Sequence, residues 1–99
     1  MRAERTNRDF REEVERLRQE QGLSLRALAE LAGVSHSYLS RLLRQVDYKK
    51  NPSLRVTAAV AEALGKPPDY FGEYREAYII QRIQGSPRLR DRMYDSLQK

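Results

Sequence analysis

The chain has 99 residues, of which 19 are lysine or arginine and 14 are aspartate or glutamate, so its formal net charge is +5. This length allows one small domain with a modest core, too small for an elaborate active-site cleft, and the absence of cysteine excludes disulfides and thiolate metal sites. No apolar run approaches the roughly 20 residues of a membrane-spanning helix, and the N-terminus is too polar for a secretory signal. We therefore expect a soluble, cytoplasmic protein whose positive charge suits a polyanionic partner.

The first elements in the chain are an arm and a helix. Residues 1–6 contain two arginines and no apolar anchor, which predicts a mobile N-terminal arm that either lies on a phosphate backbone or is merely solvated by its charges. Over residues 7–21, Phe10, Val14 and Leu17 recur on one side of a helix whose early acidic residues favour its positive end.

Residues 23–44, with the sequence LSLRALAELAGVSHSYLSRLLR, contain two short apolar-patterned segments joined at Gly33. Ser24 and Ser35 stand where each helix would begin, and a serine hydroxyl there can accept a hydrogen bond from a free amide of the first turn. Gly33 can adopt a left-handed backbone conformation and so reverse the chain within three residues. Small Ala29 would let the two helices cross closely. This spacing predicts a helix-turn-helix.

The second helix of this motif has one polar and one apolar side. At 100° per residue, the apolar side carries Tyr38 and three leucines, which we expect to pack inward. The polar side carries His36, Ser37, Ser40, Arg41 and Arg44.

An exposed helix face with arginines, hydroxyls and an imidazole has the donors and acceptors that match base edges in the DNA major groove. The residues expected to read bases are His36, Ser37, Ser40 and Arg41. The residues expected to contact the DNA backbone are Ser24, Arg26, Tyr38, Arg44, Lys49 and Lys50. Tyr38 could instead pack in the core or contact a thymine methyl group, and the whole polar face could be a solvated surface with no ligand.

Two further helices follow. After a polar loop, Pro52 and Ser53 begin a fourth helix that Gly65 ends. Two prolines then precede Asp69, which we expect to cap a fifth helix beginning at Tyr70.

The C-terminal residues 73–99 differ from the rest because residues 73–84 are apolar on two sides of a helix, which requires two partners. One would be the chain's own domain, and the other a second subunit or the final helix. That helix begins at Ser86 with Pro87 in its first turn. The residues expected to form a dimer or partner surface are Tyr78, Ile79, Ile80, Ile83 and Met93.

Residues 9–72 resemble the Cro/lambda-repressor-type helix-turn-helix family, also called xenobiotic-response-element-like regulators. The resemblance rests on the run over residues 23–44, on NPSL at residues 51–54, on AEALG at residues 61–65, and on the aromatic pair of PDYF. It implies an all-α protein: a five-helix lambda-repressor-like domain over residues 7–72, followed by one or two C-terminal helices.

The chain departs from the family pattern at two positions. Leu25 replaces a glutamine that often begins the second helix, so that glutamine's bracing role is not carried over. Gln45 replaces the usual glycine after the third helix, and the loop that follows is longer, so that helix could continue beyond Arg44.

The family implies a DNA-binding transcriptional regulator, usually a dimer on a palindromic operator, with repression favoured over activation. The alternative is an antitoxin-like or adaptor protein that acts through its C-terminal helices. We expect no enzymatic activity, cofactor or metal: His36 lies on an exposed helix face without a catalytic partner, and the sequence has no glycine-rich phosphate loop or metal-ligand cluster.

Overall fold

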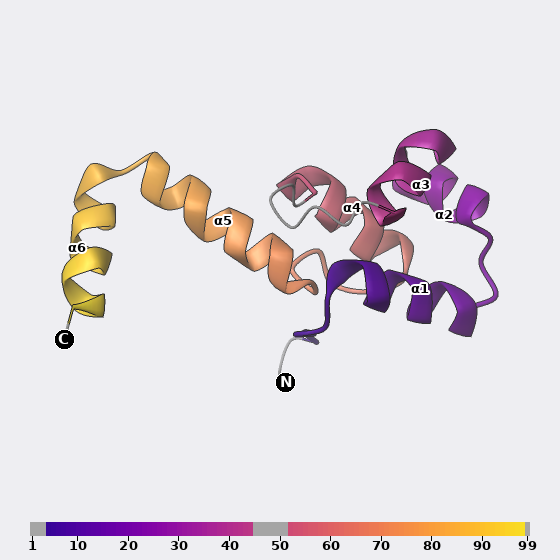
Figure 1. The fold of residues 1–99 in the computed structure, drawn as a ribbon, viewed down its shortest axis with the longest axis horizontal. Helices are drawn as coiled ribbons and strands as arrows, with labels where there is room; N and C mark the ends of the chain where they lie inside the picture. The colour runs from indigo at the N-terminus through magenta and orange to yellow at the C-terminus, as the bar shows by residue number, and fades with distance from the viewer. Residues whose placement is uncertain (1–3, 45–51, 99) are drawn as a thin grey trace.

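A computed structural model describes residues 4–44 and 52–98, and within these ranges the chain forms six α-helices and no strand (Figure 1). The helices are α1 (Phe10–Glu20), α2 (Leu25–Ala32), α3 (His36–Arg44), α4 (Leu54–Ala63), α5 (Gly72–Gln84) and α6 (Pro87–Leu97). The all-α architecture is therefore confirmed.

A single hydrophobic core joins α1 to α4 with the aromatic pair that precedes α5. Phe10 and Phe71 meet edge to face with ring centroids 4.8 Å apart, and Tyr70 packs edge-on against Phe71. The remaining buried apolar residues are Val14, Leu17, Leu28, Ala29, Leu39, Leu42, Val60, Ala61 and Leu64. The predicted inward faces of α1 and α3 are thus the ones that pack.

The predicted helix starts and the central turn are confirmed. The hydroxyls of Ser24, Ser35 and Ser53 each accept a hydrogen bond from the backbone amide three residues on, at 3.0, 3.0 and 3.2 Å. Gly33 has φ +72°, the left-handed conformation that glycine adopts without steric cost. Beside it, the Val34 amide bonds the Ala29 carbonyl, which closes the end of α2.

The predicted start of the fifth helix is wrong. α5 begins at Gly72, and its N-cap position is Phe71, which has an extended backbone and no capping side chain. Asp69 lies opposite Arg5 instead, at 3.5 Å. The Tyr70 amide bonds the Pro67 carbonyl, and the Tyr70 carbonyl accepts from the Thr6 amide, while the side chains of Tyr70 and Phe71 are buried in the core.

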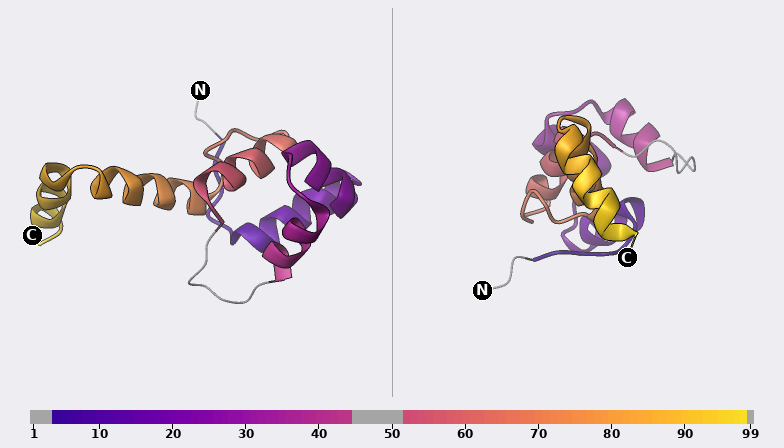
Figure 2. Two further views of the ribbon diagram at one scale, coloured as in Figure 1. Left: turned by 90° about the horizontal axis from the view of Figure 1, so that it is seen from above. Right: turned by 90° about the vertical axis from the view of Figure 1, so that its left-hand side faces the viewer.

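Helices α5 and α6 form a C-terminal arm that extends away from the helices α1–α4 (Figures 1 and 2). α6 packs against α5 and lies at its far end. No residue of either helix is buried. The molecule measures 46 × 33 × 21 Å, and the arm accounts for its elongation.

The N-terminal residues 4–9 lie against the start of the arm. The Thr6 amide donates to the Tyr70 carbonyl at 2.9 Å, and Arg75 Nη2 donates to the Thr6 carbonyl at 2.6 Å. Glu73 Oε2 accepts from the Phe10 amide at 3.0 Å. The mobility predicted for residues 1–6 stays a prediction, and these contacts would have to open for residues 4–6 to move.

Candidate nucleic-acid interface

Helix α3 is held at the surface of the domain by its apolar side. Leu39 and Leu42 are buried, while Tyr38 and Leu43 pack at the edge of the core. Ser35 caps the first turn through the Tyr38 amide. Because one side is anchored in the core, the opposite side of the helix must face outward.

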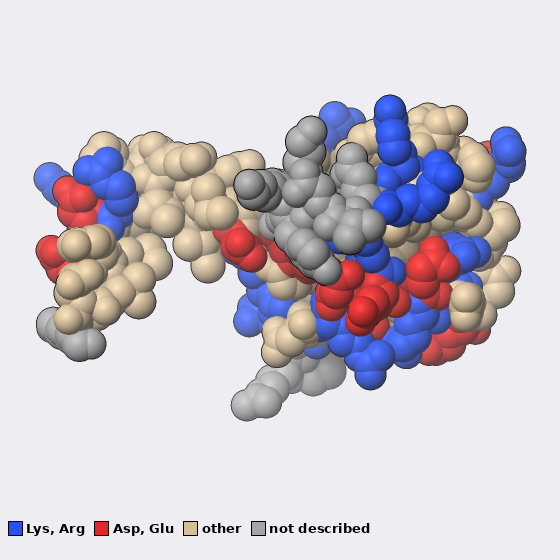
Figure 3. Space-filling model, viewed as in Figure 1, with Lys and Arg blue, Asp and Glu red and all other residues tan. Residues whose placement is uncertain are grey.

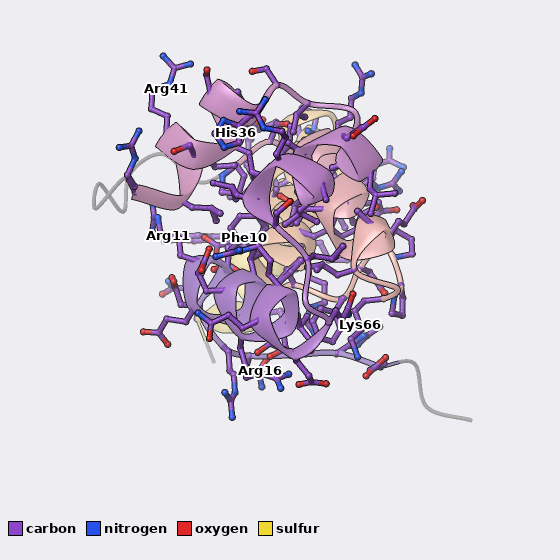
Figure 4. The ribbon with its side chains drawn as sticks, turned by 90° about the vertical axis from the view of Figure 1, so that its right-hand side faces the viewer. Phe10, Arg11, Arg16, His36, Arg41 and Lys66 are labelled. Atoms are coloured by element: carbon purple, nitrogen blue, oxygen red, sulfur yellow. The ribbon has the colours of Figure 1, made fainter. Side chains whose placement is uncertain are left out.

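The residues predicted to read bases lie on this outward side of α3. Ser37 and Arg41 are exposed, whereas His36 and Ser40 are half-buried. Arg41 extends from the helix into solvent (Figure 4). The described surface therefore presents a guanidinium and a hydroxyl most openly, with an imidazole and a second hydroxyl recessed beside them.

The residues predicted to contact the DNA backbone lie around α3, and they differ in exposure and in the hydrogen bonds that they already make. Arg26, in the first turn of α2, is exposed. The Ser24 hydroxyl already accepts the capping hydrogen bond, which leaves its proton available to an acceptor. Arg44 is exposed, and its Nε donates to the Ser40 carbonyl at 3.3 Å. Lys49 and Lys50 lie outside the described residues.

A groove of about 590 Å³ runs between the helix-turn-helix and the start of α4. Arg41 lines it from α3, and Arg55 lines it from the first turn of α4. Tyr38 also lines the groove, so this half-buried ring has one side toward the core and another toward the groove. Blue arginine and lysine atoms gather over this upper part of the domain in Figure 3.

Arg55 is a candidate that the sequence interpretation missed. It is exposed, and it lines the same groove as Arg41 although fourteen positions separate them in the chain. The excess of basic residues over residues 35–55 was a signal, but only the fold brings the start of α4 beside α3.

Arg11 of α1 is a second residue that the sequence interpretation missed. Its Nε donates to the Leu42 carbonyl in the last turn of α3 at 3.3 Å. Carbonyls in the last turn of a helix lack intrahelical partners and carry partial negative charge, so a guanidinium stabilises them. Arg11 therefore ties the C-terminal end of α3 to α1.

An acidic and basic network lies on the opposite side of the domain from Arg41. Glu13 is 1% exposed, and its two carboxylate oxygens accept from Arg16 Nε and Nη2 at 2.8 and 2.9 Å. The Tyr70 hydroxyl donates to the same carboxylate. Arg16 points away from the α3 surface (Figure 4). This network joins α1 to the segment before α5 and does not form part of the candidate interface.

Hydrogen bonding from Arg16 and Tyr70 outweighs the effect of burial and lowers the pKa of Glu13 to about 2. Burial, with the hydrogen bond to Glu13, raises the pKa of the Tyr70 phenol. The carboxylate is thus charged throughout the neutral range, and its role is structural.

The predicted dimer or partner surface lies on the arm, away from α3. Tyr78, Ile79 and Ile80 are exposed, while Ile83 and Met93 are half-buried. On the face shown in Figure 3, α5 is largely uncharged, whereas the α6 end of the arm carries blue and red side chains, as the domain does.

The described residues contain no group of three His, Asp or Glu side chains placed to hold a metal ion. None of the helices described is long and apolar enough to cross a membrane.

The chain was compared with models of known protein families. A family model described as helix-turn-helix covers residues 14–71, which is more than half of the chain. The match includes α2, α3 and α4 in full. No curated protein matches the chain.

Proposed function

Because the chain belongs to the Cro/lambda-repressor-type helix-turn-helix family of DNA-binding transcription regulators, we propose that it reads a specific operator with α3 in the major groove. The observation that carries this proposal is the exposed polar side of α3, which is held outward by buried Leu39 and Leu42. The groove of B-DNA is wide enough to admit such a helix.

In this proposal Arg41 pairs with a guanine. Its guanidinium can donate two hydrogen bonds to the O6 and N7 acceptors of that base. Ser37 lies one turn earlier and is exposed, so it would reach a neighbouring base edge. His36 and Ser40 are half-buried and would contact base edges beside these two residues.

The backbone contacts would lie on both sides of α3. Arg26 and the Ser24 hydroxyl would meet one phosphate strand at the start of α2, with Tyr38, Arg44, Lys49 and Lys50 as further candidates. We add Arg55, because the groove that it shares with Arg41 is open and basic and lies directly beside α3. Phosphate contacts fix the position of the protein without reading the sequence.

We further propose that the protein is a homodimer on a palindromic operator and acts as a repressor. Two recognition helices would meet half-sites about 34 Å apart, one turn of DNA. The predicted dimer surface is the arm residues Tyr78, Ile79, Ile80, Ile83 and Met93. An adaptor or antitoxin-like function is the second candidate, supported by the same exposed apolar arm.

The decisive experiment is the effect of Arg41→Ala on cognate and random DNA. The cognate sequence is first selected from a pool of random duplexes, and binding is then measured by fluorescence anisotropy. We expect a loss of about 1 to 3 kcal/mol on the cognate site and little change on random DNA.

Arg92→Ala is the matched control, since Arg92 is an exposed arginine on α6 and lies far from α3. An equal loss on both DNAs would make Arg41 a phosphate contact in the groove with Arg55. No binding to any duplex in the pool would overturn the DNA-binding proposal.

A further inference from the structure

The first turn of α1 is held in part by a side chain from outside its own helix. Asp9, at the N-cap position, accepts from the Arg11 and Glu12 amides at 3.1 and 3.4 Å. A capping side chain of this kind reaches the second and third amides of a helix and leaves the first without a partner. In α1 that first amide belongs to Phe10, and it donates to Glu73 Oε2 of α5 at 3.0 Å. The start of α1 therefore depends on a carboxylate sixty-three positions later in the chain.

The surroundings of Glu73 favour this hydrogen bond. The residue is half-buried in the first turn of α5, so water screens its carboxylate only in part. Negative charge is also favourable beside the positive N-terminal end of α1. Phe10 is 3% exposed, and an amide with so little access to water loses more when its acceptor is removed than an amide on an open surface does.

The residue that follows Phe10 contacts α3. Arg11 Nε donates to the Leu42 carbonyl in the last turn of α3 at 3.3 Å. Phe10 and Arg11 are consecutive residues in one turn of α1, so a shift of that turn moves both. Two hydrogen bonds made by neighbouring residues of α1 thus connect the first turn of α5 to the last turn of α3.

We propose that Glu73 is a positioning residue for α3. Its carboxylate fixes the first turn of α1, and that turn fixes the last turn of α3 through Arg11. The polar side of α3 keeps its angle in the major groove while both hydrogen bonds are made. DNA phosphates repel a carboxylate, so Glu73 acts on operator binding through α1 and not by touching DNA. This inference rests on the proposed function, because it gives a residue of the arm a part in operator recognition.

Glu73→Ala and Glu76→Ala form a matched pair of variants. Each removes one negative charge from the first two turns of α5, and Glu76 is exposed. Any gain in DNA affinity from the lost charge is therefore similar in both, and it cancels in the ratio of cognate to random affinity. Anisotropy titrations give this ratio. We expect Glu73→Ala to lower it about fivefold and Glu76→Ala to leave it within about twofold of the wild-type value.

A double-mutant cycle with Arg11→Ala tests the route through α1. If Glu73 acts through Arg11, Glu73→Ala should change the ratio by less than about twofold in a chain that already carries Arg11→Ala. A further loss of about fivefold in the double variant would show that the two residues act independently, and it would overturn the proposal.

Glu73→Gln separates the hydrogen bond from the charge. Its side-chain carbonyl oxygen can still accept from the Phe10 amide, so the affinity ratio should return to within about twofold of the wild-type value. A ratio as low as that of Glu73→Ala would overturn the proposal. Equal losses of Glu73→Ala on both DNAs, with a lower midpoint of thermal unfolding, would indicate a general structural role and would overturn it too.

Amide NMR spectra of the protein without DNA separate this proposal from the function on which it rests. We expect Glu73→Ala to shift the signals of Leu42, Leu43 and Arg44 in the last turn of α3, and Glu76→Ala to leave them in place. Unchanged signals in Glu73→Ala would overturn the positioning role even where the operator is bound. If the signals shift but no duplex is bound, the positioning of α3 stands and the DNA-binding proposal fails.

Discussion

The carboxylate of Glu13 is buried, yet it is fully charged at neutral pH. The cost of removing a carboxylate from water is offset by three hydrogen bonds: two from Arg16, which remains 43% exposed, and one from the Tyr70 hydroxyl. Because Tyr70 directly precedes Phe71 and α5, the side chain of Glu13 links α1 to the segment from which the arm begins.

This environment predicts that stability falls in acid. The folded-state pKa of Glu13 is about 2 and lies below its ordinary value of 4.5, so the folded chain binds this proton less readily than the unfolded chain does. The contribution of Glu13 is complete above about pH 5 and is lost as the pH falls from there towards 2. Urea unfolding at pH 7 and pH 3 measures this loss.

Glu13→Gln is the matched variant for that titration. We expect it to lower the free energy of unfolding by about 1 to 3 kcal/mol at pH 7, because the amide cannot accept from both Arg16 nitrogens and Tyr70. It should also flatten the dependence of stability on pH between 5 and 2. A variant whose pH dependence equals that of the wild-type chain would show that other carboxyl groups cause the acid loss.

Single residues also mark where the sequence was a sufficient guide. Gly33, Ser24 and Ser35 could be assigned from the chain because a cap or a left-handed turn depends only on residues within one helical turn. Glu13 could not, because a glutamate early in a helix is expected on the surface. Its burial depends on Tyr70, fifty-seven positions away, which no local pattern predicts.

At the scale of the elements, α3 is fixed at both ends by different means. Ser35 caps its N-terminal turn, a contact that the sequence predicted. Arg11 from α1 bonds the Leu42 carbonyl in its last turn, a contact that the sequence did not predict because it joins residues from separate helices. The direction in which α3 projects its polar side therefore depends on α1 as well as on the turn.

We predict that Arg11→Ala weakens binding to the cognate DNA more than binding to random DNA. Without the guanidinium, the end of α3 loses a hydrogen bond worth about 1 kcal/mol and the helix is less firmly oriented in the groove. Anisotropy titrations on both DNAs measure the difference. Arg11→Lys should restore part of it, since an ammonium can also donate to the Leu42 carbonyl.

An equal loss on both DNAs, with no recovery in Arg11→Lys, would contradict this positioning role. It would indicate instead that Arg11 contacts DNA through its fork-shaped donor group. Thermal unfolding of each variant is the control, because a loss of affinity caused by general unfolding would be matched by a lower midpoint.

The helices themselves were largely predictable, and the exceptions have a physical reason. The apolar spacing located α1 to α4 and α6, because each of these helices has a single apolar stripe. The sequence predicts that the fifth helix begins at Tyr70, because an aspartate after two prolines resembles a cap, whereas α5 begins at Gly72. In the structure, the backbone before α5 bonds the N-terminal residues, and only the tertiary fold brings them together.

At the scale of the whole molecule, the basic groove beside α3 and the exposed apolar side chains of the arm lie on different parts of the chain. Arg41 and Arg55 line that groove on the domain, whereas Tyr78, Ile79 and Ile80 are exposed on α5, and Tyr94 and Leu97 on α6. This separation would let DNA binding and dimer formation use different surfaces of one small chain.

The distribution of charge predicts a steep dependence of DNA affinity on salt, because each neutralised phosphate releases counterions. If Arg55 contacts one phosphate per copy, Arg55→Gln should reduce the slope of log K against log salt by about 1 for each bound copy. The Arg92→Gln variant should keep the wild-type slope. An unchanged slope in Arg55→Gln would remove Arg55 from the interface.

The N-terminal residues that lie against α5 have a consequence for the order of folding. Thr6 leaves the ribosome long before Arg75, the residue whose side chain bonds its carbonyl, and sixty-nine positions separate the two. In the same way, the Phe10 amide can donate to Glu73 only after that residue has been synthesised. We expect contacts of such high sequence separation to close late, because the entropy of closing the loop between them must be overcome first. On this expectation, the earliest part of the chain to be synthesised is among the last to reach its place, and with it the direction of the arm.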